Sequence, residues 1–108
     1  VRRDMKVVCE EVFGPVVTVV PYRNIDEALE IANDSRFGLQ GGLFTRSLEI
    51  MYKVAREFRV GGLMVNDASS FRVDQMPYGG VKNSGIGREG PRYAIEDMTE
   101  LHLVVVNL

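Results

Sequence analysis

The chain has 108 residues, enough for one domain with a buried core but few for a complete enzyme that binds two substrates. Hydrophobic residues make up 45% of the chain and charged residues 26%, which is typical of a soluble globular domain and argues against a disordered or fibrous protein. The net charge of −2 and the short charge clusters do not suit a nucleic-acid partner, and no apolar run is long enough to predict a membrane span.

Cysteine and histidine usage limits the chemistry that the chain could carry. A single cysteine, Cys9, rules out a disulfide within the chain and suits the reducing cytoplasm. A nucleophile pair of Cys9 with the only histidine, His102, is less favoured than two strand residues without a chemical role. No spacing fits a zinc site, so we expect no metal ion. The chain begins with Val1 rather than methionine, which suggests a processed or partial protein.

Two strands are predicted in the first part of the chain. Met5–Val8 is a short apolar strand that ends before Glu10–Glu11 and the turn at Gly14–Pro15. Val16–Tyr22 is apolar and β-branched almost throughout, which predicts a strand covered on both faces, as in a parallel sheet.

A capped helix and a glycine-containing strand follow. Asn24 can cap the helix, and Glu27 completes a capping box. The helix should end at 33–35, and Leu39–Phe44 should form the next strand. The glycines at 41 and 42 lack side chains, which suggests that this strand packs closely against a neighbour.

The middle of the chain predicts another helix and strand. Ser47 caps a helix whose apolar residues follow helical spacing up to Phe58. Gly61–Gly62 should stop this helix, and Leu63–Asn66 should form the third strand of the unit. The alternation of strands and helices with short connections predicts an α/β fold, with a parallel βαβαβ sheet unit and flanking helices in one domain.

The last third of the chain is organised around a glycine-rich loop. Asp67–Gln75 is a polar loop, and the following segment Met76–Gly90 contains five glycines. The spacing fits no nucleotide-binding loop, so a packed loop that leads into a helix is favoured over an anion site. Pro91 suits the first turn of that helix, and Leu101–Leu108 is a predicted apolar strand.

The acidic pair Glu10–Glu11 has two readings on physical grounds. It could be a solvated turn before Val16–Tyr22. Alternatively, one carboxylate accepts hydrogen bonds from ligand hydroxyls while Phe13 supplies a flat apolar wall, a common combination in small-molecule pockets.

Several motifs in order resemble the C-terminal part of the aldehyde dehydrogenase superfamily. They are Glu11-x-Phe13-Gly14-Pro15, Asp34-x-x-Phe37-Gly38-Leu39, Gly61-Gly62-x-x-Val65-Asn66 and Pro77-x-Gly79-Gly80-x-Lys82-x-Ser84-Gly85-x-Gly87-Arg88-Glu89. The resemblance covers essentially the whole chain. It implies that residues 1–108 form a single partial domain, the C-terminal part of the catalytic domain of an enzyme that oxidises a small aldehyde to its acid with NAD or NADP.

The resemblance also implies roles for individual residues. Glu11 matches the glutamate that holds the nicotinamide ribose hydroxyls, and Phe13 matches the aromatic residue beside the nicotinamide. Phe71 and Arg72 lie on the loop that borders the aldehyde tunnel. Leu101–Leu108 resembles the strand through which subunits pair, so a homo-oligomer, a dimer or a tetramer, is expected in the cytoplasm.

The catalytic residues of the superfamily do not match this chain. The nucleophilic cysteine, the general-base glutamate, the oxyanion-hole asparagine and the dinucleotide-binding unit belong to other parts of these enzymes, and Cys9 does not match the nucleophile. The resemblance therefore implies that the 108 residues alone are inactive. The competing interpretation is a non-catalytic interaction module that pairs through exposed strands.

Arg72 gives a further hypothesis about the substrate. The sequence Phe71–Asp74 followed by Met76–Gly80 resembles superfamily members that act on lactaldehyde, glyceraldehyde phosphate or succinate semialdehyde. An arginine at the tunnel mouth could bind a carboxylate or phosphate through two hydrogen bonds. The alternative is a surface arginine paired with Asp74.

Overall fold

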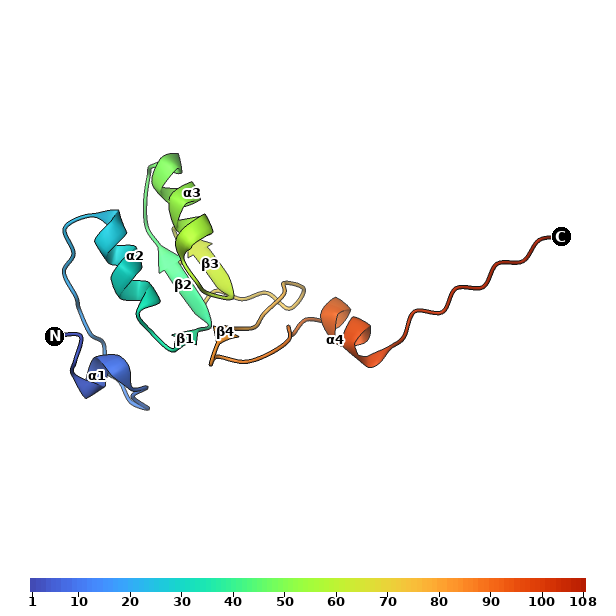
Figure 1. The fold of residues 1–108 in the computed structure, drawn as a ribbon, viewed down its shortest axis with the longest axis horizontal. Coiled ribbons are helices and arrows are strands. Elements are labelled where there is room, and N and C mark those ends of the chain that lie inside the picture. Colours follow the sequence, from blue (N-terminus) through green and yellow to red (C-terminus); the bar gives the residue numbers. More distant parts are fainter.

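Two helices lie side by side against a pair of parallel strands, and this unit holds the small core of the protein (Figure 1). The computed structural model describes all 108 residues. The full element order is α1 (Lys6–Cys9), α2 (Ile25–Asn33), β1 (Phe37–Gly38), β2 (Gln40–Leu43), α3 (Leu48–Glu57), β3 (Gly62–Val65), β4 (Val81–Lys82) and α4 (Pro91–Met98). None of the helices has the length and apolar character needed to cross a membrane.

Strand β2, helix α3 and strand β3 form a βαβ unit. The strands are parallel, with Gln40 opposite Gly62 and Leu43 opposite Val65. Leu29 from α2 and Val54 from α3 are the two buried hydrophobic residues, with 6% and 3% of their surface exposed. The predicted strands at Leu39–Phe44 and Leu63–Asn66 are therefore confirmed, with each end shifted by one residue.

The caps predicted for the two long helices are present. The side chain of Asn24 accepts a hydrogen bond from the N–H of Glu27 at 3.0 Å, and that of Ser47 accepts one from Ile50 at 3.3 Å. In a capping box, the Glu27 carboxylate would accept a hydrogen bond from the backbone N–H of Asn24. Here it accepts from the backbone N–H of Arg23, one residue earlier. Helix α3 ends at Glu57, so the predicted stop at Gly61–Gly62 is late, and Gly62 begins β3 instead.

Gly41 shows why a glycine occupies the middle of β2. A Cβ atom added there would lie 2.2 Å from Cε1 of Phe58, so the ring packs where a side chain would otherwise stand. The close packing expected for this strand is therefore confirmed.

In the glycine-rich loop Met76–Gly90, Gly85, Gly87 and Gly90 have positive φ angles of 132°, 74° and 121°, so this segment is a shaped loop.

Three predicted strands are not strands in the structure. Met5–Val8 lies largely in helix α1. Val16–Tyr22 and Leu101–Leu108 have no strand partner, and most of their side chains are exposed, with Val17 at 87%. A β-strand requires a neighbouring strand with which to exchange backbone hydrogen bonds. Neither segment pairs with any of the strands β1 to β4.

The sheet also differs from a single parallel unit. β1 pairs with β4 in antiparallel orientation, with Phe37 opposite Lys82, and this small pair is separate from β2 and β3. The fold is therefore mixed α/β, and the parallel pairing is limited to one βαβ unit.

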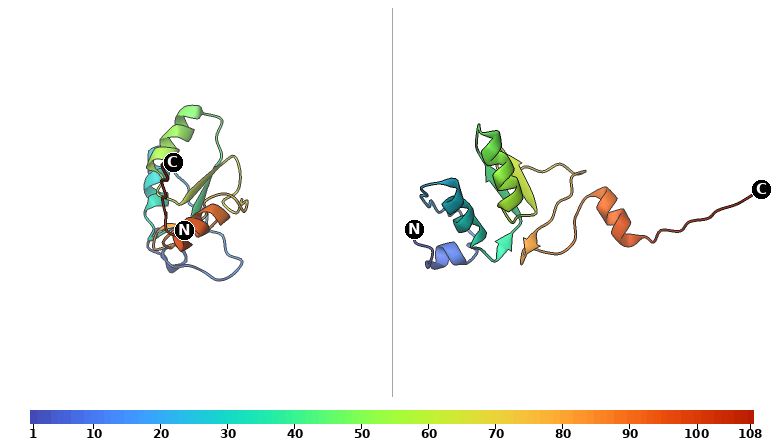
Figure 2. Two further views of the ribbon diagram at one scale, coloured as in Figure 1. Left: turned by 90° about the vertical axis from the view of Figure 1, so that its right-hand side faces the viewer. Right: turned by 45° about the horizontal axis from the view of Figure 1, so that its top comes forward.

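The C-terminal segment after α4, residues 99–108, extends away from the helices and strands (Figures 1 and 2). The radius of gyration is 18.3 Å, against about 13 Å for a compact chain of this length. The accessible surface is 8921 Å², whereas a compact monomer of this mass exposes about 6,000 Å². The chain thus leaves roughly half as much surface again uncovered, much of it apolar.

Candidate functional site

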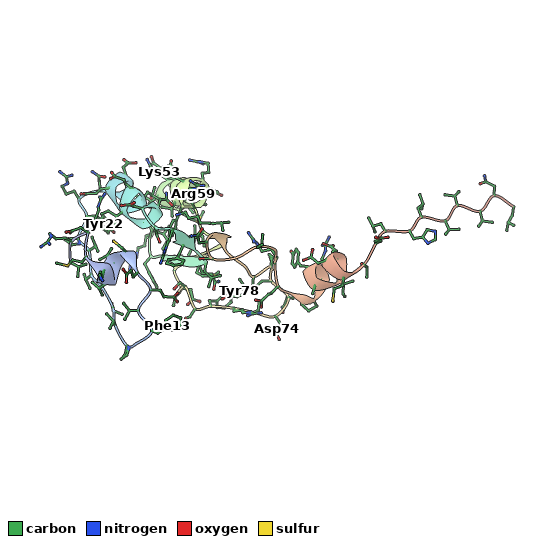
Figure 3. The ribbon with its side chains drawn as sticks, turned by 60° about the horizontal axis from the view of Figure 1, so that its bottom comes forward. Phe13, Tyr22, Lys53, Arg59, Asp74 and Tyr78 are labelled. Atoms are coloured by element: carbon green, nitrogen blue, oxygen red, sulfur yellow. The ribbon has the colours of Figure 1, made fainter.

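Glu11 and Phe13 lie on an exposed loop that follows α1. Two tight backbone hydrogen bonds shape the loop, from Gly14 to Val12 at 3.0 Å and from Val16 to Gly14 at 2.8 Å. Phe13 is 94% exposed and is labelled on this loop in Figure 3. The carboxylate of Glu11 is exposed and forms no ion pair. Both side chains are therefore free to contact a ligand.

Glu11 borders an open groove of about 550 Å³. One wall is the end of α1 with the residues that follow it, and the other wall is the turn before β2 together with Asn83 and Ser84. The lining residues are Val8, Cys9, Glu10, Glu11, Ala32, Ser35, Phe37, Gly38, Leu39, Gln40, Phe58, Val60, Asn83 and Ser84. Phe13 does not line this groove.

Lys82 holds the second wall of this groove in place. Its Nζ donates to the backbone carbonyls of Asn33 and Ser35 at 2.9 and 3.0 Å, at the C-terminal end of α2. An ammonium group is favourable there because helix C-termini carry partial negative charge. The hydroxyl of Ser84 accepts from the N–H of Gly38 at 2.8 Å, which ties the next residues of the wall together.

The first wall is held by a different contact. Arg3, just before α1, forms an ion pair of 2.8 Å with Glu30 on α2. The hydrogen bond that Arg3 donates to the Glu30 carboxylate raises the pKa of Arg3. The thiol of Cys9 donates to the backbone carbonyl of Arg3 at 2.9 Å. Cys9 is exposed and lies on a helix, so its prediction as a strand residue is wrong.

Phe71 and Arg72 lie on the loop between β3 and β4, beside a second hollow of about 390 Å³. This hollow is lined by Leu39, Gln40, Ser69, Ser70, Arg72 and Tyr78. The backbone carbonyl of Phe71 accepts from Nε2 of Gln40 at 3.2 Å, which anchors the loop to β2. The Phe71 ring does not line the hollow.

The guanidinium of Arg72 is held by two groups. Its Nη2 lies 2.9 Å from Oε2 of Glu89, and its Cζ lies 4.3 Å from the centre of the Tyr78 ring. The alternative prediction that Arg72 pairs with Asp74 is therefore wrong, because Asp74 takes no part in this contact. Figure 3 labels Asp74 and Tyr78, which both lie on the segment between β3 and β4.

The two hollows meet at Leu39 and Gln40, which line both of them. The structure thus places Glu11 and Arg72 on adjoining hollows, with Phe13 and Phe71 outside their linings. Sequence reasoning missed Gln40, although it is the only polar side chain in the strand 39–44. That isolated polar residue was a usable signal.

No group of three or more His, Cys, Asp or Glu side chains could hold a metal ion. The acid and amide groups near the hollows can instead hold polar organic ligands. The arrangement offers an exposed carboxylate for hydroxyl groups, an exposed phenyl ring for a flat ring system and a guanidinium for an anion.

Comparison with known proteins gives a consistent picture. The profile described as "Aldehyde dehydrogenase family" matches residues 1–104. The chain is 60% identical over 108 residues to a 3-sulfolactaldehyde dehydrogenase from Priestia aryabhattai, covering all of this chain and 23% of that protein. It is 46% identical to a lactaldehyde dehydrogenase from Methanococcus maripaludis, covering 90% of this chain and 21% of that protein.

Solved structures agree with these relatives. Aldehyde dehydrogenase 21 from Physcomitrella patens, in complex with the reaction product succinate, has a TM-score of 0.88 and 42% identity, covering 92% of this chain and 21% of its own. The glyceraldehyde-3-phosphate dehydrogenase GapN from Methanocaldococcus jannaschii, complexed with NADP, has a TM-score of 0.68 and 46% identity, covering 70% of this chain and 17% of its own. The chain thus shares their mixed α/β fold and spans about a quarter of the length of the relatives it matches.

Proposed function

Because the chain belongs to the aldehyde dehydrogenase family, we propose that these 108 residues are part of an NAD(P)-dependent enzyme that oxidises a small aldehyde to its acid. The observation that carries the proposal is the family match over residues 1–104, which includes the loop that presents Glu11 and Phe13 to solvent. The catalytic groups come from other parts of the enzyme in this proposal. Cys9 is not proposed as the nucleophile, because it does not match the motif of the nucleophile in the superfamily.

Glu11 and Phe13 are the proposed contacts to the cofactor. Glu11 would accept hydrogen bonds from the hydroxyls of the nicotinamide ribose, because an ionised carboxylate is purely an acceptor. Phe13 would pack its ring against the nicotinamide. The exposed carboxylate and the exposed ring fit these tasks. When bound, NAD(P)+ would supply the hydride acceptor for aldehyde oxidation.

The exposed segments Val16–Tyr22 and Leu101–Leu108 are proposed to become strands in the complete enzyme. Both are apolar and extended, and their backbone hydrogen-bonding groups lack a ladder partner in this chain. Other parts of the catalytic domain would pair with Val16–Tyr22 and complete a parallel sheet. Leu101–Leu108 would pair with a second subunit and produce a dimer or a tetramer.

The contacts of Arg72 favour the hypothesis that the substrate is a small aldehyde with a negatively charged end. Its guanidinium uses one N–H group on Glu89, and Arg72 lines a hollow together with the polar residues Ser69 and Ser70. Two similar proteins are named for anionic aldehydes, 3-sulfolactaldehyde and glyceraldehyde 3-phosphate, and a third is described in complex with its anionic reaction product succinate. Another relative is named for lactaldehyde, which is neutral. A preference for anionic over neutral aldehydes is therefore tested directly below.

The cofactor role is tested by binding of NAD and NADP to the full-length enzyme. Glu11→Gln should raise the dissociation constant about tenfold, because the carboxylate's charge-assisted hydrogen bonds are weakened. Glu49→Gln on α3 is the matched control, since its exposed carboxylate forms no ion pair and lies outside the groove beside Glu11, and it should leave binding within about twofold. Equal effects of the two substitutions would refute the assignment of Glu11.

The substrate role is tested by steady-state kinetics with succinate semialdehyde and propanal. Arg72→Ala should raise KM for the anionic aldehyde about tenfold or more and leave KM for propanal nearly unchanged. An equal change for both aldehydes would defeat the proposal that Arg72 binds the anionic end.

The second candidate function is a non-catalytic module that binds a partner through its exposed strands. The observation in its favour is the large uncovered surface of 8921 Å². The same surface is explained by contacts within a longer dehydrogenase. Aldehyde turnover by the full-length protein would decide against the module.

A further inference from the structure

Arg72, Tyr78 and Glu89 form a cluster that joins two loops. Tyr78 and Glu89 exchange two backbone hydrogen bonds of 3.1 and 2.6 Å in an antiparallel bridge. This bridge fixes the position from which the Glu89 side chain starts. Arg72 lies on the same loop as Tyr78, between β3 and β4, and contacts both the Tyr78 ring and the carboxylate of Glu89, which lies between β4 and α4.

The contacts of Arg72 leave most of its donors available. The guanidinium has five N–H groups in a fixed planar arrangement, and one nitrogen, Nη2, donates to Glu89 at 2.9 Å. Tyr78 covers one face of the group at 4.3 Å. The remaining donors can serve the hollow that Arg72 shares with Ser69 and Ser70, but an anion that takes both Nη groups in a bidentate contact must displace Glu89 from Nη2.

Glu89 changes the charge that a ligand meets at this hollow. Without Glu89, an anion would approach a full positive charge on Arg72. With the carboxylate 2.9 Å from Nη2, the anion instead approaches an ion pair with no net charge. The carboxylate therefore competes directly with any anion that binds Arg72.

We propose that Glu89 is a specificity-determining residue that sets the preference of the enzyme for anionic over neutral aldehydes. This inference depends on the proposed function of Arg72 as the anion contact. The Glu89 carboxylate occupies the guanidinium in the free enzyme, and the anionic end of the substrate displaces it. A neutral aldehyde makes no such exchange, so Glu89 lowers the affinity for anionic ligands selectively.

The exposure of the pair limits the size of the effect. The side chains of Arg72 and Glu89 are 42% and 65% exposed, so water screens their attraction. Exposed ion pairs change equilibrium constants by about fivefold at most. We therefore expect removal of the Glu89 charge to tighten the binding of an anionic ligand by about threefold to fivefold.

The test measures the binding of succinate and propanoate to the full-length enzyme by calorimetry, so turnover is not required. Both probes carry one carboxylate, and only succinate carries a second. Glu89→Gln should lower the dissociation constant of succinate about threefold to fivefold and leave that of propanoate unchanged. In an Arg72→Ala background, the same substitution should change neither constant.

Two controls make the result specific. Glu96→Gln removes the carboxylate of a similar exposed ion pair, Arg92–Glu96 at 2.8 Å on α4, which does not line the hollow. It should leave the ratio of the two constants unchanged. Glu89→Ala should act in the same direction as Glu89→Gln, which keeps the test available if one variant fails to fold.

The outcomes separate this inference from the function on which it depends. If Arg72→Ala alone leaves the succinate-to-propanoate ratio unchanged, the anion-binding role of Arg72 fails. If Arg72→Ala changes the ratio but Glu89→Gln does not, the role of Glu89 is refuted. An effect of Glu89→Gln that persists without Arg72 also refutes it, because competition requires both side chains.

Discussion

Replacement of Gly61 by alanine should destabilise the protein more than any other single methyl addition to its glycines. A Cβ at position 61 would lie 1.7 Å from the backbone carbonyl oxygen of Gly79, whereas ordinary contacts begin at 3.4 Å. One of the two backbone segments must therefore move by about 1.7 Å. Neither side has a flexible side chain that could move instead.

The cost of this movement can be estimated from the contacts that it strains. The N–H of Gly61 donates to the carbonyls of Gly38 and Leu39, both at 3.0 Å, and this contact links the start of β3 to β1 and β2. Hydrogen bonds of this kind contribute about 0.5–1.5 kcal/mol each, and overpacking costs about 1–3 kcal/mol. We expect the free energy of unfolding to fall by about 2–5 kcal/mol.

Urea unfolding of the full-length enzyme, followed by circular dichroism, measures this loss. Gly14→Ala is the matched control, because no atom lies within 4 Å of a Cβ at that position. It should change the free energy by less than about 1 kcal/mol. A Gly61→Ala enzyme as stable as the control would show that the approach of Gly61 to Gly79 is not a constraint on the fold.

Three other predictions concern a cap, a pH response and the isolated chain. Ser47→Ala should cost about 1 kcal/mol of stability in urea unfolding, whereas Ser47→Asp should keep the cap on Ile50; equal losses would contradict the capping role. The hydrogen bond from the Arg23 side chain lowers the pKa of Glu27 from 4.5, so its stabilisation is complete above pH 4.5 and is lost as the pH falls further. Thermal unfolding of Glu27→Gln between pH 7 and pH 3 should therefore depend less on pH than that of the parent, and parallel curves would contradict this assignment. The isolated residues 1–108 should self-associate and oxidise no aldehyde; a stable 12.1 kDa monomer by light scattering, or genuine turnover, would contradict the proposed role as part of a larger enzyme.

Elements with local signals were predictable from the sequence. Helices α2 and α3 carry their caps and their apolar spacing within a dozen residues, and both form where expected. The β2 and β3 strands were also found, because short apolar runs flank a helix that joins them. In these cases the interactions that decide the structure lie close together in the chain.

Elements that depend on distant neighbours were not predictable. Val16–Tyr22 has the composition of a buried strand, but it remains extended and exposed because no neighbouring strand completes it. Met5–Val8 has a similar composition, and its i to i+4 hydrogen bonds form a short helix instead. Composition alone does not supply the pairing partner on which a strand depends.

The candidate site shows the same division. A solvated position for Glu11 was one of the two readings of the acidic turn, whereas Phe13, expected as a pocket wall, lies exposed and outside the lining of the groove that Glu11 borders. The partner of Arg72 was not expected, because Asp74 is near in sequence while Glu89 is 17 residues away. That contact depends on two loops meeting, and the bridge between Tyr78 and Glu89 that brings them together has no short-range sequence signal.

The shared position of Gln40 has a consequence for evolution and engineering. One side chain fronts both the groove beside Glu11 and the hollow beside Arg72, and its amide also anchors the backbone of Phe71. A substitution of Gln40 that enlarges the groove therefore changes the shape of the hollow as well, and the reverse also holds. Under the proposed function, in which Glu11 contacts the dinucleotide and Arg72 the aldehyde, a change of aldehyde preference obtained through Gln40 would also change dinucleotide affinity, so independent tuning of the two ligands would need residues that line only one hollow.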